Sequence, residues 1–74
     1  MITVEDISKK IAEAIKFGGF TQTVLAQKVG VSQQQISSYL SGKNLPALDT
    51  FSRLCSALDL DANEILCVER PKEY

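Results

Sequence analysis

The chain has no histidine and only two cysteines, Cys55 and Cys67, among its 74 residues. The cysteines do not form a CxxC pair and are too few for a disulfide scaffold. The sequence also has no glycine-rich phosphate loop and no nucleophile with a recognisable base. We therefore expect no metal site, no cofactor and no enzymatic activity. Cys55 is interpreted as a small core residue and Cys67 as a free thiol near the end of the last helix.

The sequence also lacks a long hydrophobic run. No apolar segment approaches the ~20 residues that a membrane-spanning helix needs, and no charged leader with an apolar core begins the chain. A chain of this length forms one small domain, here residues 1–68, and buries only about 60% of its unfolded surface. We expect a soluble, cytoplasmic protein with a thin margin of stability and a frayed tail at residues 69–74.

Acidic residues are absent between Glu13 and Asp49, although the whole chain carries a net charge of −1 and has an isoelectric point near 5.2. Within that segment Lys16, Lys28 and Lys43 contribute three positive charges. Such a surface can hydrogen-bond bases and phosphates without repelling them, although three lysines release few counterions. The same segment contains every glutamine of the chain: Gln22, Gln27, Gln33, Gln34 and Gln35.

Hydrophobic spacing and capping residues predict an all-α chain of five helices. Thr3 and Asp6 fit a capping box that opens the first helix, which ends at Gly18 and Gly19. Asp61 and Glu64 fit a second capping box, which starts a short fifth helix. The apolar positions expected to face the core are Val4, Ile7, Ile11, Ala14 and Ile15 in the first helix, and Phe51, Leu54, Cys55 and Leu58 in the fourth, which begins near Leu48.

The pattern of residues 21–42 predicts two short helices joined by a tight turn. Thr21 is a good N-cap for the first of them, and Gly30 follows its last apolar position, where a left-handed backbone is least costly. Ser32 offers a second N-cap two residues later. Because Ala26 is small, the two helices can approach each other closely. This is the architecture of a helix that enters DNA.

These residues resemble the phage-repressor and Cro-like helix-turn-helix family of bacterial transcriptional regulators, also called the xenobiotic-response-element-like family. The resemblance implies a compact all-α fold with a central helix-turn-helix, and a two-fold dimer on operator DNA. It covers roughly residues 20–66. The matching positions are FTQ at 20–22, LA at 25–26, GVS at 30–32, IS at 36–37, SGK at 41–43, Pro46 and ALDL at 57–60.

In this family the first residues of the second helix of the motif reach base edges in the major groove. A glutamine amide there can pair with adenine N6 and N7 or donate to guanine, so glutamine alone does not fix the operator sequence. The alternative is that the consecutive glutamines form only a solvated helix face. By the resemblance, the base-reading residues are Gln33, Gln34 and Ser38, with Gln35 and Ser37 as further candidates.

Phosphate contacts are expected on both sides of the reading helix. Gln22 lies in the first turn of a helix, where free N–H groups and the positive end of the helix dipole favour an anion. Thr21, Lys43 and Asn44 can clamp the other side of the groove. The alternative for Lys43 and Asn44 is a plain surface turn, and for Lys28 it is a side chain that faces away from DNA.

Two positions depart from the family pattern. Many members pair a glutamate at the position of Leu40 with an arginine in the first helix, where this chain has Ile15. We expect Ile15 to pack on Leu40, because well-filled apolar volume can replace a buried ion pair at little cost. Ala47 stands where the family tends to place a capping serine or threonine. This loss costs the fourth helix about 1 kcal/mol, partly offset by Asp49.

The sequence therefore predicts a homodimeric, sequence-specific regulator of double-stranded DNA, and specifically a repressor of the Cro-like, prophage, plasmid or restriction-control kind. The last helix and the tail, with Ile65, Val68 and Tyr74, are the expected dimer surface, although Ile65 can equally belong to the core. The alternative is a protein-interaction module, such as an antitoxin or anti-repressor subunit. It is supported by residues 49–74, where six acidic and three basic side chains leave a net charge of −3.

Overall fold

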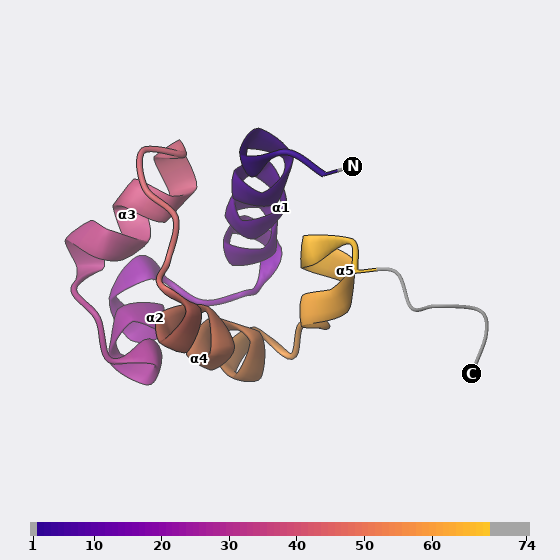
Figure 1. Cartoon of the computed structure of the whole chain (residues 1–74). Coiled ribbons are helices and arrows are strands. Elements are labelled where there is room, and N and C mark those ends of the chain that lie inside the picture. The colour runs from indigo at the N-terminus through magenta and orange to yellow at the C-terminus, as the bar shows by residue number, and fades with distance from the viewer. Residues whose placement is uncertain (1, 69–74) are drawn as a thin grey trace.

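The computed structural model describes residues 2–68, and every regular element within them is a helix. This confirms the all-α prediction. None of the helices in this part of the chain is long and apolar enough to cross a membrane. The predicted tail at residues 69–74 lies outside the described residues. The helices, drawn in Figure 1, are α1 (Val4–Phe17), α2 (Gln22–Val29), α3 (Gln33–Ser41), α4 (Leu48–Leu58) and α5 (Ala62–Leu66).

Helix α1 begins at the predicted capping box. The Thr3 hydroxyl accepts a hydrogen bond from the Asp6 N–H (3.1 Å), and the Asp6 carboxylate accepts one from the Thr3 N–H (3.3 Å). Hydrogen bonding of the Asp6 carboxylate to Thr3 holds the pKa of Asp6 below its ordinary value. The bond to the Thr3 backbone has the larger effect, and the bond to the Thr3 side chain the smaller one. The helix ends at Gly18, as predicted.

Helix α5 begins in a different way from the prediction. The Asp61 carboxylate accepts a hydrogen bond from the Asn63 N–H (2.9 Å), and Glu64 does not complete a capping box. The predicted capping box of Asp61 and Glu64 is therefore wrong. The short aspartate side chain reaches the N–H two residues ahead, as in an Asx turn, and leaves the Glu64 side chain exposed.

Helices α2 and α3 meet at a turn that begins at Gly30. Gly30 adopts a left-handed backbone with φ of 80°, and its N–H and that of Val31 both donate to the Ala26 carbonyl. These bonds supply partners to a carbonyl group in the last turn of α2, and the chain turns into α3 within three residues. Ser32 then caps α3, and the predicted motif at residues 21–42 is confirmed.

The core is built where the faces of the five helices meet. Leu25, Ile36 and Leu54 come from three different helices and are almost completely buried. Because they belong to one buried cluster, they hold α3 against the rest of the molecule. The buried apolar residues are Ile11, Ile15, Leu25, Ala26, Val29, Ile36, Tyr39, Phe51, Leu54 and Ile65.

Some expected core positions lie at its edge. Val4 is 64% exposed, so its predicted inward position is wrong. It is the first residue of α1, where the apolar periodicity continues beyond the last neighbour that could cover it. Ala14, Cys55 and Leu58 are half-buried, and burial raises the pKa of the Cys55 thiol. Ile65 belongs to the core rather than to a free surface.

Two positions depart from the family pattern, Leu40 and Ala47. Leu40 is half-buried and packs against the core cluster that contains Ile15, while direct packing of the two side chains stays a prediction. Ala47 makes no side-chain capping bond, as expected, and Asp49 lies in the first turn of α4.

The exposed thiol of Cys67 lies at the end of α5, as predicted. It accepts a hydrogen bond from Lys10 Nζ at 3.0 Å, and the same ammonium donates to the Glu64 carbonyl at 3.3 Å. The bond to Cys67 raises the pKa of Lys10. Lys10 therefore fastens α5 to α1.

Candidate nucleic-acid interface

Helix α3 has one buried face and one exposed face. Ile36 and Tyr39 are buried, whereas Gln33, Gln34 and Ser37 are exposed. The helix is nine residues long, and an α-helix with its side chains is about 10–12 Å across, close to the ~12 Å width of the DNA major groove. Its exposed face therefore has the size and the hydrogen-bonding groups that a major groove accepts.

Gln35 takes part in the cap of its own helix. Its Oε1 accepts a hydrogen bond from the Ser32 N–H (3.0 Å), and the Ser32 hydroxyl accepts one from the Gln35 N–H (3.1 Å). This reciprocal pair is a capping box, which the spacing of serine and glutamine in the sequence could have indicated. The amide oxygen of Gln35 is occupied in the cap, and its N–H donors stay available.

The side chain of Gln33 is hydrogen-bonded to Thr23 of the preceding helix. The hydroxyl of Thr23 in α2 donates to Oε1 of Gln33 at 3.2 Å. Sequence reasoning missed Thr23, since no local pattern relates a residue of α2 to a partner ten positions along the chain. The bond brings the N-terminal ends of α2 and α3 together.

Ser38 is half-buried beside a hollow of about 360 Å³ between α3 and the loop that precedes α4. Its hydroxyl donates to the Gln34 carbonyl (3.1 Å), one helical turn earlier. The proton of Ser38 is therefore used within the helix, and its oxygen remains an acceptor for a base amino group.

Thr21 and Gln22 lie at the start of α2. Thr21 is the N-cap, and its hydroxyl accepts a hydrogen bond from the Val24 N–H (3.2 Å), so its proton stays free to donate. Gln22 is half-buried as the first residue of the helix. The first turn of α2 contains no acidic residue, which leaves the positive end of its dipole uncompensated.

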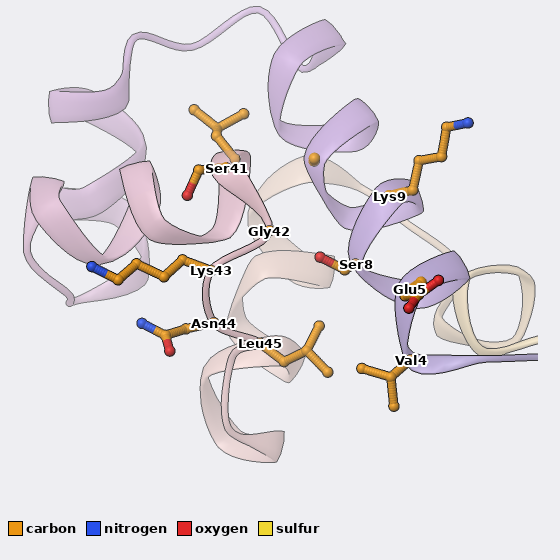
Figure 2. Close-up of a pocket in the computed structure, with 11 residues that line it drawn as sticks. Val4, Glu5, Ser8, Lys9, Ser41, Gly42, Lys43, Asn44 and Leu45 are labelled. Carbon is orange, nitrogen blue, oxygen red and sulfur yellow. The ribbon is translucent and has the colours of Figure 1, made fainter.

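Lys43 and Asn44 follow the other end of α3 and are exposed. Their backbone N–H groups both donate to the Ser38 carbonyl, at 3.0 and 3.4 Å. In Figure 2 their side chains lie on one side of the loop, while Leu45 lies on the other, toward Val4 and α1. The polar side of this loop therefore continues beyond the end of α3, and Lys43 and Asn44 also line one edge of the groove of about 580 Å³ between the loop and α1.

The predicted site residues fall into three adjoining groups. The candidate base-reading residues lie along α3, the start of α2 adjoins its N-terminal end through Thr23, and the loop with Lys43 and Asn44 follows its C-terminal end. The ammonium of Lys28 lies 5.3 Å from the centre of the Phe20 ring, within the range of a cation–π contact.

One comparison with known proteins identifies the family of this chain. A family model described as helix-turn-helix matches residues 11–65, which include all of α2, α3 and α4. The comparison with curated proteins found no match, and neither did the comparison with solved structures. The match covers well over half of the chain and confirms the resemblance to the phage-repressor and Cro-like proteins.

Proposed function

Since the chain belongs to the helix-turn-helix family, a family of DNA-binding regulators, we propose that it is a sequence-specific transcriptional repressor that reads the major groove with α3. The observation that carries this proposal is the face of α3 on which Gln33, Gln34 and Ser37 are exposed while Ile36 and Tyr39 anchor the helix in the core. A polar face held by a rigid apolar face can present the same groups to every base pair that it meets.

Gln33 and Gln34 carry the base reading in this proposal. A glutamine amide that pairs well with one base edge gives about 1–3 kcal/mol of discrimination against the wrong base. Ser37 and Ser38 add hydroxyl groups further along the helix, and Gln35 offers its N–H donors from the cap. Because Gln35 also holds the start of α3, its contribution to reading is the smallest of the three glutamines.

Phosphate contacts at both ends of α3 orient the domain. Thr21 and Gln22 offer a hydroxyl proton and the uncompensated first turn of α2, while Lys43 and Asn44 offer an ammonium and an amide from the loop. Contacts of this kind fix the register of the protein without reading the sequence. With one lysine in the set, we expect a modest dependence of affinity on salt for each subunit.

We further propose that two copies bind a near-palindromic operator, with their α3 helices about 34–36 Å apart. Of the predicted dimer surface, Ile65 belongs to the core, and Val68, which is 55% exposed, stays a candidate. Tyr74 lies outside the described residues. Occupancy of the operator would block other proteins from the same DNA, which is why we propose repression, in the cytoplasm of a bacterial cell.

Selection from a random duplex pool tests this function. The wild-type chain should enrich a sequence with two related half-sites, and Gln34→Ala should relax the preference at one base position of each half-site. Lys43→Ala should weaken binding to every sequence alike. If no sequence is enriched, and binding does not weaken with salt, DNA reading is the wrong function.

A protein-interaction module is the second candidate, because Asp59, Asp61 and Glu64 form an exposed acidic stretch at the end of α4 and in α5. A module that holds a basic partner through these residues can retain the helix-turn-helix fold without using α3. The pool selection separates the two candidates, since this one predicts no enriched sequence.

A further inference from the structure

The hydrogen bond between Thr23 and Gln33 joins the two helices of the motif at their N-terminal ends. Thr23 is the second residue of α2, Gln33 is the first residue of α3, and both are exposed. Among the described residues it is the only side-chain to side-chain hydrogen bond between these two helices. An exposed pair contributes little to stability, so a role in the orientation of Gln33 explains it better.

We propose that Thr23 is a positioning residue that fixes the carboxamide of Gln33 and thereby selects the base that Gln33 reads. The inference rests on the proposed function, in which Gln33 contacts a base edge. A free glutamine amide can turn by 180° about its last torsion angle and exchange its oxygen and its NH₂ group. Such an amide accepts adenine and guanine alike. A fixed amide does not.

The orientation has two physical causes. The Thr23 hydroxyl donates to Oε1 of Gln33 at 3.2 Å. In addition, the N-terminal ends of two helices meet at Gln33, and the first turns of both contain no acidic residue. The partial positive charge of these ends attracts the amide oxygen and repels the NH₂ group. Both effects turn Oε1 toward α2 and leave the two Nε2 protons for the groove.

An amide that presents donors matches guanine. In the major groove guanine offers two acceptors, N7 and O6, whereas adenine offers the acceptor N7 beside the N6 amino donor. Pairing with both groups of adenine would need Oε1, which is turned toward Thr23. Gln33 should therefore prefer guanine. Gln34, whose side chain makes no hydrogen bond within the described residues, should accept either purine.

Base preference measured for the whole chain tests the proposal. Gln33→Ala first identifies the base position that Gln33 reads, as the one where preference is lost. Thr23→Val removes the hydroxyl but keeps the branched shape, and Thr23→Ser restores the hydroxyl as the matched control. Affinities are then measured for duplexes that carry guanine or adenine at the identified position, with circular dichroism to verify that each variant is folded.

We expect the wild type and Thr23→Ser to favour guanine, and Thr23→Val to lower the guanine-to-adenine affinity ratio roughly tenfold at that position alone, which corresponds to about 1.4 kcal/mol. An unchanged ratio in Thr23→Val would overturn the proposal, as would a wild-type preference for adenine at the position of Gln33. In both cases an enriched sequence still supports DNA reading. Failure of the wild type to enrich any sequence would instead reject the proposed function, and this inference with it.

Discussion

The guanidinium of Arg53 in α4 donates a hydrogen bond to the backbone carbonyl of Val29, the last residue of α2, at 3.3 Å. Its other terminal nitrogen contacts the Asp49 carboxylate at 3.1 Å. Carbonyl groups in the last turn of a helix have no partner within that helix. Arg53 therefore supplies a partner to the end of α2 immediately before the turn at Gly30, and joins α4 to the helix-turn-helix.

Replacing Arg53 should lower the free energy of unfolding. Arg53→Ala removes a charged hydrogen bond to a partly buried carbonyl, and because half of the side chain is exposed we expect a loss of about 1 kcal/mol. Arg53→Lys should lose nearly as much, since one ammonium cannot contact Val29 and Asp49 together as the planar fork does. Urea unfolding measures both. Wild-type stability in Arg53→Lys would mean that charge alone, and not the bridge to Val29, matters.

The start of α4 offers a simple gain in stability. Ala47 is the N-cap of this helix, has an extended backbone and makes no capping bond. Ala47→Ser should add a hydrogen bond to the first turn and stabilise the protein by about 1 kcal/mol. For a domain of this size the melting temperature would then rise by roughly 4–8 °C. Ser52→Ala, at an exposed position inside the same helix, serves as the control for helix propensity and should stabilise by no more than about 0.5 kcal/mol.

Substitution of Leu40 tests whether apolar packing replaces the glutamate–arginine ion pair of the family at this position. It is half-buried against the core cluster that contains Ile15. Leu40→Glu would place a charge against this apolar cluster, where Ile15 stands in place of the family's arginine, and we expect a loss of about 1–2 kcal/mol of stability. Leu40→Met keeps the volume and should cost much less. If thermal unfolding of Leu40→Glu matched that of the wild type, the expected packing of Ile15 on Leu40 would be wrong.

Local chemistry explains which parts of the fold could be predicted. Thr21, Gly30 and Ser32 define the helix-turn-helix because each acts on backbone groups within a few residues of itself. Val4 is exposed although its spacing predicts a core position, because periodicity identifies a helix face but not the point at which the neighbouring elements end. The choice between an Asx turn and a capping box at Asp61 depends on small differences in side-chain reach.

The bonds that support the candidate site could not be predicted from sequence. Arg53 and Val29 are 24 positions apart, and Thr23 and Gln33 are 10 apart. The packing of the helices around Leu25 and its neighbours brings the members of each pair together, and no local sequence pattern predicts such contacts. The candidate contact residues themselves followed from the family resemblance, and their roles on DNA stay predictions.

The capping box of α1 should give a pH dependence. Hydrogen bonds from Thr3 hold the pKa of Asp6 below its ordinary value in the folded chain, so the unfolded chain binds this proton more readily. The stabilisation by Asp6 is present above its ordinary pKa and is lost as pH falls through the folded pKa. Urea midpoints of the wild type and Asp6→Asn should therefore converge between about pH 5 and pH 2. A constant difference would contradict this account.

Affinity for the selected duplex, measured against salt, tests the reading role of α3 most directly. Gln34→Ala should lower the ratio of the affinities for the selected and a scrambled duplex about tenfold, without a change in the dependence of affinity on salt. Lys43→Ala should lower the affinity for both duplexes and reduce the slope of log affinity against log salt by about one unit per subunit. Gln27→Ala, an exposed glutamine of α2, is the matched control and should behave as the wild type. Equal affinity of the wild type for both duplexes would contradict a reading role of α3. The same affinity ratio in Gln34→Ala and Gln27→Ala would contradict it as well.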